Sequence, residues 1–485
     1  MIIRRVTEPL LSHNCWIIAC PRTRQALLVD PVRDPSACLA AATDLRVNVV
    51  RVLETHTPSD YVSGVCEVLV RTAATALLSA AEPKPRWYSE RADRWRDRVQ
   101  FLTDGDTFRI GDLECGVMHS PGHTVGSITV LLSHPATGTR ALLAGDALLA
   151  GGLGALHPDH GGHMCETLRR LCLLPDDVLL LSAHDAGSAC GTGIELPGAT
   201  NIGVERRFNR LLVAVQKGDD SAVLQRLAQL DRPSYFARIE SINERSRVDL
   251  LLQGTAPDRL HQDTFLQLLT LPNTMVIDTR SWSSFRADGV VGAVHAPLDK
   301  YFMTTVGTAV DSEEDITFIA DANEAHEVVH ALRLLGLDRI RGWIATEDYN
   351  QLERGLLDLS DLEEIGIRRA ADLYARGECV MLDVRTSTEW GRGHVRGAHL
   401  VTLSQLAEHV QRLPRDRLLV AYCRSGGRSA RACSFLARRG FNCATLQGGY
   451  YPWLGRGLPV DEEFGAPPSD ATVIPAGSAP TGAAV

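Results

Sequence analysis

The C-terminal half of the chain contains the same sequence pattern twice, with the two copies roughly 100 residues apart. Each copy has an apolar run that ends in Asp-x-Arg, at residues 275–280 and again at 380–385. A Gly-Ala pair, a second apolar run, a loop and a helical segment follow in both copies. Apolar runs that alternate with helical segments are typical of α/β domains. The repeat therefore predicts two α/β domains of one kind rather than a solenoid of short units.

The repeat divides the chain into three blocks and a tail. We expect residues 258–357 and 360–460 to form the two α/β domains, and residues 1–255 to form a larger domain before them. The 485 residues suffice for this division, because one domain usually takes roughly 100–200 residues. Residues 461–485 are rich in Pro, Gly, Ala and Ser and are predicted to be disordered.

Charge and composition narrow the range of ligands and partners. Acidic residues outnumber basic ones by 59 to 50, which argues against a nucleic-acid-binding surface and favours small-molecule ligands. No apolar run reaches the roughly 18 residues that a membrane span requires. The twelve cysteines form no close Cys-x-x-Cys pair and lie in apolar runs, which is typical of reduced thiols in a cytoplasm.

The amino terminus resembles a lipoprotein signal only superficially. Arg4 and Arg5 precede an apolar stretch that ends at Cys20, but Glu8 and His13 interrupt that stretch. A strand at 15–19 explains these residues better than a signal segment does, and it is predicted to form a β-hairpin with the apolar run at 26–29. Further strands are predicted at 26–29, 49–54, 113–118, 127–132 and 140–144, with helical segments at 36–45 and 200–252. This alternation predicts mixed sheets that are covered by helices.

The strongest chemical signal lies in the third block. A predicted strand at 417–422 leads directly into a loop that begins with Cys423, and a helix is predicted at 430–438. The N–H groups of such a loop, the helix dipole and two arginines together favour the nucleophilic thiolate. A purely structural cysteine would need none of these surroundings. We predict Cys423 as the nucleophile and, as the loop that binds its persulfide, Arg424, Ser425, Gly426, Gly427 and Arg428.

The third block resembles the rhodanese family of sulfurtransferases. The resemblance rests on Asp383-Val384-Arg385, Glu389-Trp390, Gly393-His394-Val395, Gly397-Ala398, the Cys423 loop, Gly448-Gly449 and Trp453. It implies that Cys423 accepts a sulfane sulfur and passes it to a second thiophile. The Cys-x5-Arg spacing alone also fits tyrosine phosphatases, whereas the flanking motifs favour rhodanese. Asp383 and Arg385 are expected to stabilise the loop and the fold.

The second block resembles the same family but lacks its nucleophile. Asp321 occupies the position after a predicted strand where the thiol should stand, and the block contains no cysteine. A carboxylate cannot carry sulfur and would repel an anionic donor. We therefore predict a structural or docking copy.

The first block contains four residues of metal-ligand types: His56, Asp146 and His184, each just past a strand end, and His123 within the segment 120–127. Loops at one edge of a sheet are where ligands usually converge. Two neutral imidazoles and one carboxylate suit Fe(II), Zn(II) or Mn(II). Each of these residues taken singly is more often structural, but the four placements together predict a metal site.

The order and flanks of these residues resemble the metallo-β-lactamase fold. The first motif of that family is His-x-His-x-Asp-His, and here Pro58 and Tyr61 stand in place of two histidines. A dinuclear zinc hydrolase uses both missing histidines as ligands. The ordinary dinuclear site is therefore not expected.

The persulfide dioxygenases are a branch of this fold that the chain resembles more closely. The resemblance implies one Fe(II) per chain, bound by His56, His123 and Asp146 with open positions for substrate and O₂. Asp60 and His184 are expected to orient these ligands through hydrogen bonds. The family's Gly-Arg-x-Asp motif is absent, since residues 154–159 read Gly-Ala-Leu-His-Pro-Asp. Recognition of glutathione-type thiols and O₂ consumption are therefore expected to be weaker than is usual in the family.

Fused bacterial persulfide dioxygenase–sulfurtransferases resemble nearly the whole chain, including residues 183–191 and 200–207. They carry a lactamase-fold domain and two rhodanese-like domains, of which the first is often degenerate. Within the first segment, Cys190 is either a sulfur relay that faces the metal pocket or a buried structural thiol. Both roles stay open.

The sequence thus predicts a multidomain α/β fold, with a metallo-β-lactamase αββα sandwich followed by two rhodanese-like domains. The expected activity is oxidation of a small-molecule persulfide to sulfite with O₂, as in hydrogen sulfide detoxification, coupled to sulfur transfer through Cys423. Thiosulfate or sulfite would be further ligands; no nucleic acid or membrane partner is expected, and a homo-oligomer is left open. Two alternatives remain: a thioester hydrolase of the glyoxalase II type, and a sulfurtransferase whose first domains act as scaffold or sensor.

Overall fold

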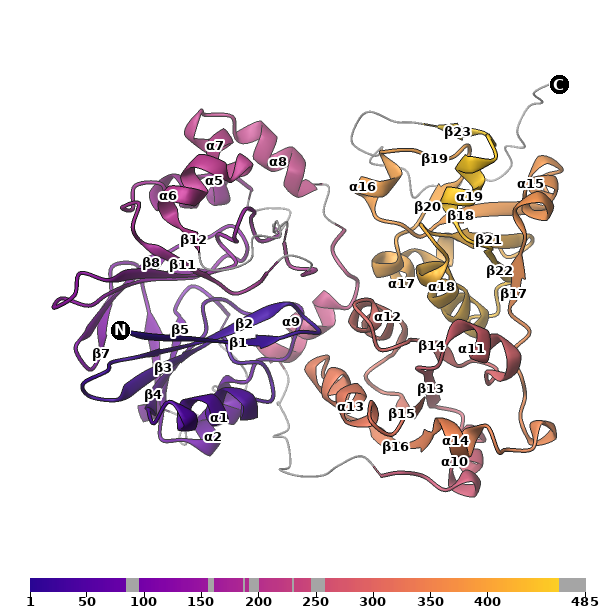
Figure 1. Cartoon of the computed structure of the whole chain (residues 1–485), viewed down its shortest axis with the longest axis horizontal. Helices are drawn as coiled ribbons and strands as arrows, with labels where there is room; N and C mark the ends of the chain where they lie inside the picture. Colours follow the sequence, from indigo (N-terminus) through magenta and orange to yellow (C-terminus); the bar gives the residue numbers. More distant parts are fainter. Residues whose placement is uncertain are drawn as a thin grey trace. The chain divides into compact units, whose positions relative to one another are not determined.

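The computed structural model describes residues 1–83, 96–155, 161–185, 188–191, 200–228, 231–245 and 258–461. The chain forms two compact units (Figure 1). The first is built mainly from Met1–Arg232 and Phe236–Gly254, and the second mainly from the chain after Thr255. The predicted tail lies almost entirely outside the described residues, as do residues 156–160 of the segment that replaces Gly-Arg-x-Asp.

The first unit contains two six-stranded sheets. The first sheet follows the chain order: β1 (Ile2–Glu8), β2 (His13–Ala19), β3 (Gln25–Val29), β4 (Asn48–Leu53), β5 (Thr75–Ser79) and β6 (Val99–Leu102). Strands β2 and β3 form the expected antiparallel hairpin, and β3 to β6 run parallel. Its helices are α1 (Ser36–Asp44), α2 (Val65–Arg71) and the short η1 (Arg96–Arg98).

The second sheet has the order β12-β11-β10-β9-β8-β7. Its strands are β7 (Thr107–Ile110), β8 (Leu113–His119), β9 (Ile128–Ser133), β10 (Arg140–Gly145), β11 (Leu179–Ser182) and β12 (Thr200–Asn201). Strands β8, β10 and β11 run in one direction, so their carboxyl ends lie at the same edge. The helices that follow are α5 (Gly161–Leu171), α6 (Ile202–Phe208), α7 (Arg210–Gln216), α8 (Asp220–Ala228) and α9 (Phe236–Arg245).

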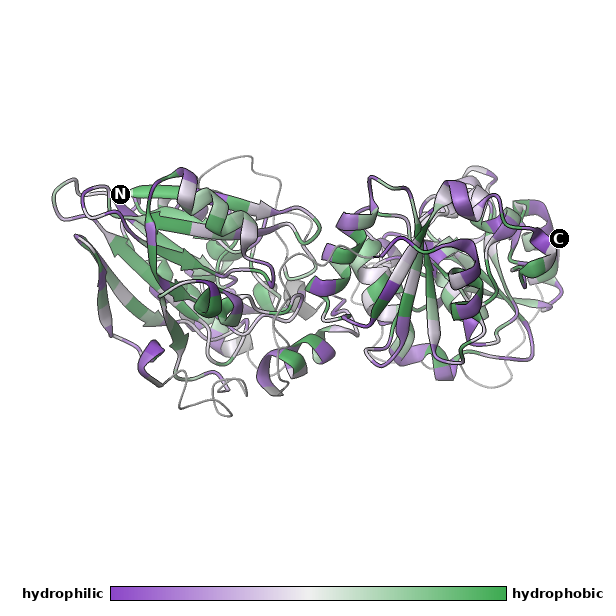
Figure 2. Ribbon diagram, turned by 90° about the horizontal axis from the view of Figure 1, so that it is seen from below, coloured by the Kyte–Doolittle hydropathy of each residue, from purple (hydrophilic) through white to green (hydrophobic). Residues whose placement is uncertain are grey.

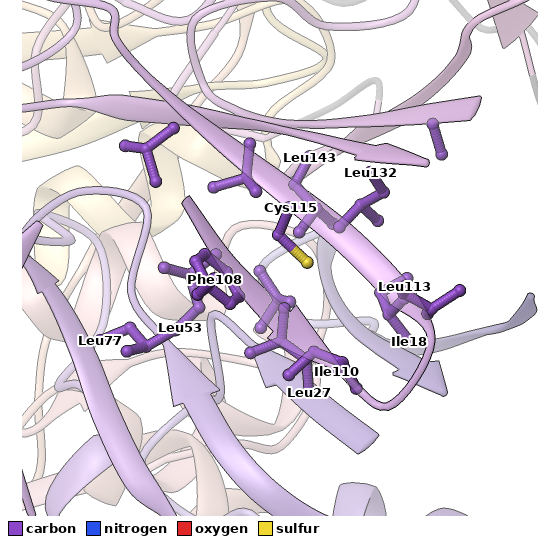
Figure 3. Close-up of a cluster of buried hydrophobic side chains, with 14 of the residues drawn as sticks. Ile18, Leu27, Leu53, Leu77, Phe108, Ile110, Leu113, Cys115, Leu132 and Leu143 are labelled. Carbon is purple, nitrogen blue, oxygen red and sulfur yellow. The ribbon is translucent and has the colours of Figure 1, made fainter. Parts of the chain in front are cut away.

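Three buried hydrophobic clusters hold these helices and sheets together as a four-layer sandwich. The central cluster lies between the sheets and includes Ile18 and Leu27 of the first sheet with Phe108 and Leu132 of the second (Figure 3). A second cluster packs α1 and α2 on the outer face of the first sheet, and a third packs α5, α7 and α8 on the second sheet. Successive residues of a strand point to opposite faces, and the strands of the sandwich are largely apolar (Figure 2), so each sheet contributes apolar residues to both neighbouring layers. The predicted αββα sandwich is confirmed.

The second unit begins with a parallel four-stranded sheet of order β14-β13-β15-β16. Its strands are β13 (Thr274–Asp278), β14 (Val294–His295), β15 (Asp315–Ala320) and β16 (Ile340–Ala345). Its helices are α10 (Gln262–Leu269), α11 (Trp282–Asp288), α12 (Phe302–Ala309), α13 (Ala325–Leu334), α14 (Thr346–Tyr349) and η2 (Arg354–Leu356).

A parallel five-stranded sheet follows, with the order β17-β22-β21-β18-β20. Its strands are β17 (Glu363–Ile365), β18 (Cys379–Asp383), β20 (His399–Leu400), β21 (Leu418–Tyr422) and β22 (Cys443–Leu446), beside the small pair β19 (His394–Val395) and β23 (Val460–Asp461). The helices are α15 (Ile367–Ala375), α16 (Ser387–Trp390), η3 (Leu403–Gln405), α17 (Leu406–His409), η4 (Val410–Arg412), α18 (Gly427–Arg438) and α19 (Tyr450–Gly455).

The two sheets share one strand order, because β14-β13-β15-β16 corresponds to β20-β18-β21-β22. The Asp-x-Arg pairs also correspond. Asp278 binds Arg280 and Asp383 binds Arg385 through buried hydrogen bonds at the end of β13 and β18. Each guanidinium lies over a tyrosine ring, at 4.3 Å from Tyr349 in the first copy and 4.2 Å from Tyr450 in the second. The repeat found in the sequence is thus a repeat of topology and of this pair.

Candidate metal centre and cysteine loop

His56, His123 and Asp146 come together at one end of the sandwich, and all three are buried. Their potential ligand atoms all lie within 4.8 Å of one another. Asp146 Oδ2 is 3.4 Å from His123 Nε2 and 3.8 Å from His56 Nε2. An ion with bonds of about 2.1 Å would hold neighbouring ligand atoms roughly 3 to 3.5 Å apart, so a small contraction suffices to bind one.

Strand ends place these side chains. His56 follows β4 of the first sheet, whereas His123 and Asp146 follow β8 and β10 of the second. Gly145 ends β10 with a φ of +52°, and a Cβ at this position would lie 2.6 Å from Thr55 Oγ1. Glycine is therefore required for the turn that brings Asp146 beside His56.

Hydrogen bonds fix the tautomer of both imidazoles. Thr55 Oγ1 donates to Asp30 Oδ2 at 2.8 Å and therefore accepts from His56 Nδ1 at 2.9 Å. His123 Nδ1 donates to the carbonyl oxygen of Ala155 at 2.5 Å. Both rings thus keep Nε2 unprotonated on the side of Asp146, the arrangement that metal-binding histidines usually show.

Burial and neighbouring charges keep the ligand atoms of His56 and Asp146 unprotonated. Burial, helped by the neighbouring His123, lowers the pKa of His56 to about 3. Burial alone would raise the pKa of Asp146, but His184 and His123 hold it below the usual range. A neutral imidazole and a carboxylate are the forms that bind a cation. The donor set therefore fits one divalent metal ion.

Asp60 and His184 lie next to this set. His184 Nδ1 is 2.8 Å from Asp146 Oδ1, and His184 Nε2 is 3.1 Å from Asp60 Oδ2. Burial opposes a charge on His184, but Asp146 and Asp60 raise its pKa well above the ordinary value. The contact with Asp146 allows the orienting role that the sequence suggested for His184, whereas Asp60 reaches the site only through that ring.

The residues that replace the two missing histidines are structural. The carbonyl oxygens of Pro58 and Tyr61 both accept hydrogen bonds from Asn243 Nδ2, at 2.8 and 2.9 Å. The Tyr61 ring packs against His13 with 4.6 Å between ring centroids, and burial raises its pKa well above the ordinary value. A neutral, buried phenol is a poor substitute for a metal-binding imidazole.

Cys190 is fully buried close to Asp60 and His184. Its carbonyl oxygen accepts the N–H of Ala155 at 2.6 Å, so Ala155 holds both His123 and Cys190. Burial first, and then the Asp60 and Asp146 carboxylates, raise the pKa of its thiol well above the ordinary value. As the protein stands, this thiol is a neutral group, which does not favour nucleophilic relay chemistry.

The Cys423 loop lies between β21 and α18 in the second unit. Cys423 Sγ accepts the N–H of Gly426 at 3.1 Å and lies 3.8 Å from Ser429 Oγ. Gly426 has a φ of +106°, which the turn of the loop requires. A Cβ on Gly449 would lie 2.4 Å from the Cys423 carbonyl oxygen, so the Gly-Gly motif lets that segment close over the loop.

The two loop arginines have different roles. Arg428 makes a paired hydrogen bond to Glu389, at 2.6 and 2.7 Å, whereas Arg424 is exposed and lies over the Tyr451 ring. The expected positive potential from Arg428 is thus largely balanced by a carboxylate. Glu389 also closes a capping box with Thr386, a Thr-x-x-Glu signal visible in the sequence.

The second copy places Asp321 where the third block has Cys423. Asp321 directly follows β15, as Cys423 directly follows β21, and these two strands occupy the same place in their sheets. Its exposed carboxylate begins a turn that leads into α13. The copy therefore has an exposed carboxyl side chain in place of a nucleophile.

Comparison with known proteins finds a family for the first unit and for the last part of the second. Residues 9–184 match the model of the metallo-beta-lactamase superfamily, and residues 368–456 match that of the rhodanese-like domain. A hydroxyacylglutathione hydrolase from Cereibacter sphaeroides is 31% identical over 46% of this chain and 86% of its own length. The chain belongs to the metallo-beta-lactamase superfamily. The rhodanese model does not cover residues 258–357, so rhodanese ancestry of that copy stays a prediction.

One solved structure agrees with the lactamase fold, and a second is reported beside it. A metallo-beta-lactamase from Staphylococcus aureus has a TM-score of 0.62 and 24% identity, and it covers 71% of this chain and 99% of its own. ETHE1 from Myxococcus xanthus has a TM-score of 0.42 and 26% identity, over 51% of this chain and all of its own. Several hydroxyacylglutathione hydrolases are matched over 64% of their own length. No helix among the described residues is long and apolar enough to cross a membrane.

Proposed function

We propose that this metallo-beta-lactamase–rhodanese fusion oxidises a small-molecule persulfide in its first domain and transfers sulfane sulfur through Cys423. The observation that carries the first half is the donor set of His56, His123 and Asp146. Two imidazoles and one carboxylate are the ligand types that would hold one ion in a two-histidine, one-carboxylate site, and Pro58 supplies no third imidazole. Such a set suits Fe(II), with positions left for a thiolate and O₂.

The side chains of the protein would bind the metal ion, and their hydrogen-bond partners would orient them. Fe(II), when bound, supplies the one-electron and O₂ chemistry. Thr55 and Ala155 hold the two imidazole rings through Nδ1, and His184 holds Asp146 through its Oδ1. The overall reaction consumes one persulfide, one O₂ and one water and yields thiol, sulfite and two protons.

The second half of the proposal follows from the loop geometry. The Cys423 thiolate would attack the sulfane sulfur of thiosulfate; the S–S bond breaks, and sulfite leaves with the bonding electron pair. The resulting Cys423 persulfide then gives its terminal sulfur to an acceptor such as cyanide, sulfite or a thiol. N–H donors such as Gly426 would stabilise the negative sulfur. Placement of both activities in one chain raises the effective concentration of the shared sulfur species.

A second candidate function has specific support. The named relatives are hydroxyacylglutathione hydrolases, so thioester hydrolysis in the first domain is the alternative. Against it stand Pro58 and Tyr61, which remove two imidazoles that a dinuclear hydrolase requires. A third possibility is a metal-free scaffold joined to an active rhodanese domain.

One set of measurements separates the three. The purified full chain is analysed for iron and zinc, then assayed for O₂ uptake with a panel of persulfides and for hydrolysis of a glutathione thioester. One iron per chain with persulfide-dependent O₂ uptake supports the dioxygenase. Two zinc ions with thioester hydrolysis support the hydrolase. A chain that takes up no metal and consumes no O₂ after incubation with iron supports the scaffold.

A further inference from the structure

The loop that follows His56 lacks two histidines that would help to hold it. It runs over residues 57–64 and leads into α2. Pro58 and Tyr61 stand where the lactamase-fold motif has these histidines. Bonds from two imidazoles to a metal ion would also fix the backbone of the loop. In this chain the loop therefore needs another support.

The side chain of Asn243 supplies three hydrogen bonds to the loop. Its Nδ2 donates to the carbonyl oxygens of Pro58 and Tyr61, at 2.8 and 2.9 Å. Its Oδ1 accepts the N–H of Ser63 at 2.9 Å. Both amide protons and the amide oxygen of one side chain are thus used on the backbone of residues 58–63.

The place of Asn243 in α9 shows that these bonds matter. Phe236, Ile239 and Asn243 follow the helical spacing of one face, and their exposed fractions are only 2%, 0% and 5%. A buried amide is costly unless it is fully hydrogen-bonded, so an apolar side chain would be the ordinary choice here. Helix α9 also lies beyond residues 9–184, which match the lactamase family. The support of the loop thus comes from outside the matched region.

The loop is connected to the metal ligands at two points. Its backbone is continuous with His56, which lies two residues before Pro58. Within the loop, Asp60 Oδ2 lies 3.1 Å from His184 Nε2, and His184 Nδ1 lies 2.8 Å from Asp146 Oδ1. A displacement of the loop would therefore reach a ligand from each of the two sheets.

We propose that Asn243 is a positioning residue for the first site, the metal-ligand set of His56, His123 and Asp146. It acts through the backbone of residues 58–63 and replaces the support that the two missing histidines would give. The inference rests on the metal site of the proposed function but not on the reaction at that site. The competing explanation is that Asn243 stabilises the fold and has no effect on the metal.

Cobalt titration tests the role. The full chain is freed of metal and titrated with Co²⁺, whose visible absorption bands report the number and arrangement of its ligands. We expect Asn243→Ala to bind the ion roughly 10–100-fold more weakly, as is usual when a group that orients the ligands is removed. The bands of the bound cobalt should also change. Asn201→Ala is the matched control, because it removes the N-cap of α6 and lowers stability away from the loop. It should keep the wild-type affinity and bands.

Asn243→Asp is the second variant and serves if Asn243→Ala does not fold. It has nearly the same shape and keeps an acceptor for the Ser63 N–H, but as a carboxylate it cannot donate to Pro58 and Tyr61. It should show the same loss of affinity. In the wild-type chain, Co²⁺ should slow amide hydrogen exchange in residues 58–63 and also in α9, because coupling between two sites is reciprocal.

Wild-type affinity and bands in a folded Asn243 variant, or exchange in α9 that does not respond to Co²⁺, would overturn the proposal. These measurements need neither O₂ nor a persulfide. A chain that shows the expected effects but oxidises no persulfide would therefore reject the proposed dioxygenase activity and keep the role of Asn243.

Discussion

Thr55 Oγ1 lies 2.9 Å from Nδ1 of His56, and the same hydroxyl donates to Asp30. The hydroxyl thereby decides which nitrogen of the neighbouring ring is available to a metal. Neither Thr55 nor Asp30 belongs to the recognised ligand motif, yet both are buried and act on it.

Thr55→Val tests this relationship. Valine has nearly the same shape but cannot accept the Nδ1 proton, so the ring loses both its orientation and its tautomer preference. We expect metal affinity to fall roughly 10–100-fold, as is usual when such a partner is removed. Titration of the metal-free chain measures the change. Thr137→Val, at an exposed turn, is the control and should bind metal like wild type; equal affinities in the two variants would contradict the role.

His123→Ala should remove the ion of the first site and any persulfide-dependent O₂ uptake. The Cys423 transfer reaction should continue, because it belongs to a different domain. His119→Ala provides the comparison, since this nearby histidine binds the Val125 carbonyl oxygen and is not among the three ligands. Iron content, oxygen uptake and transfer are measured on each variant. Full iron content in His123→Ala would remove the basis of the dioxygenase proposal.

Cys423→Ser should abolish sulfur transfer from thiosulfate to cyanide and leave the metal content unchanged. The reason is that a serine hydroxyl cannot carry a sulfane sulfur, and loss of an essential nucleophile is severe. Cys172→Ser, a partly buried thiol elsewhere in the chain, should transfer sulfur normally. Retention of more than about a tenth of wild-type activity in Cys423→Ser would show that another thiol is the carrier.

Glu389→Gln should lower transfer roughly tenfold, since it breaks the charged pair that orients Arg428 beside the loop. Burial alone would raise the pKa of Glu389, but Arg428 and Thr386 lower it to about 2. The depressed pKa means that the pair is intact above the ordinary carboxyl range and is lost only as the pH falls toward 2. The defect should therefore be the same from about pH 6 to about pH 9. Glu408 is exposed, so Glu408→Gln should transfer sulfur like wild type. If Glu408→Gln and Glu389→Gln lower transfer equally, the Glu389–Arg428 pair has no specific role in the reaction.

Asp321→Cys, made in the Cys423→Ser background, should produce little transfer. The new thiol would stand in the right place after β15, but the following Asn323 and Glu324 provide no positive charge to stabilise a thiolate. The thiosulfate–cyanide assay measures the outcome. Robust transfer would mean that the place of the thiol at the end of the strand is sufficient for activity and that the charge of the loop is not required.

Sequence patterns predicted much of this structure. The hairpin of β2 and β3, the strands β4, β8, β9 and β10, and helix α1 lie where alternation and apolar runs placed them. Helix α18 begins at Gly427, three residues before the predicted start, because the glycine-rich loop itself winds into the first turn. The predicted helical region at 200–252 is four separate helices among its described residues.

The site was harder to predict in full. The three candidate ligands could be proposed because their sequence neighbours match known motifs, and the structure brings their side chains together. The groups that orient these side chains could not be predicted. His123, for example, is held by the backbone carbonyl oxygen of residue 155, which any residue at that position supplies. Glu389 belongs to a motif of the rhodanese resemblance, but its pairing with Arg428 depends on the distance between α16 and α18. No local sequence pattern predicts that distance.

The Asp-x-Arg pair stacked on a tyrosine is present in both copies of the repeat, although only one copy has a thiol. Loss of the Asp-x-Arg pair and loss of the thiol have different consequences for the domain. Disruption of the pair leaves an unpaired charge in a core, whereas loss of the thiol removes a reaction and leaves the domain folded. After a duplication, the pair should therefore outlast the cysteine in every lineage that keeps the extra domain. On the predicted common origin of the two copies, the Asp-x-Arg pair would mark their shared ancestry in a survey of such sequences, whereas the residue that begins the loop would tell which copies keep a nucleophile.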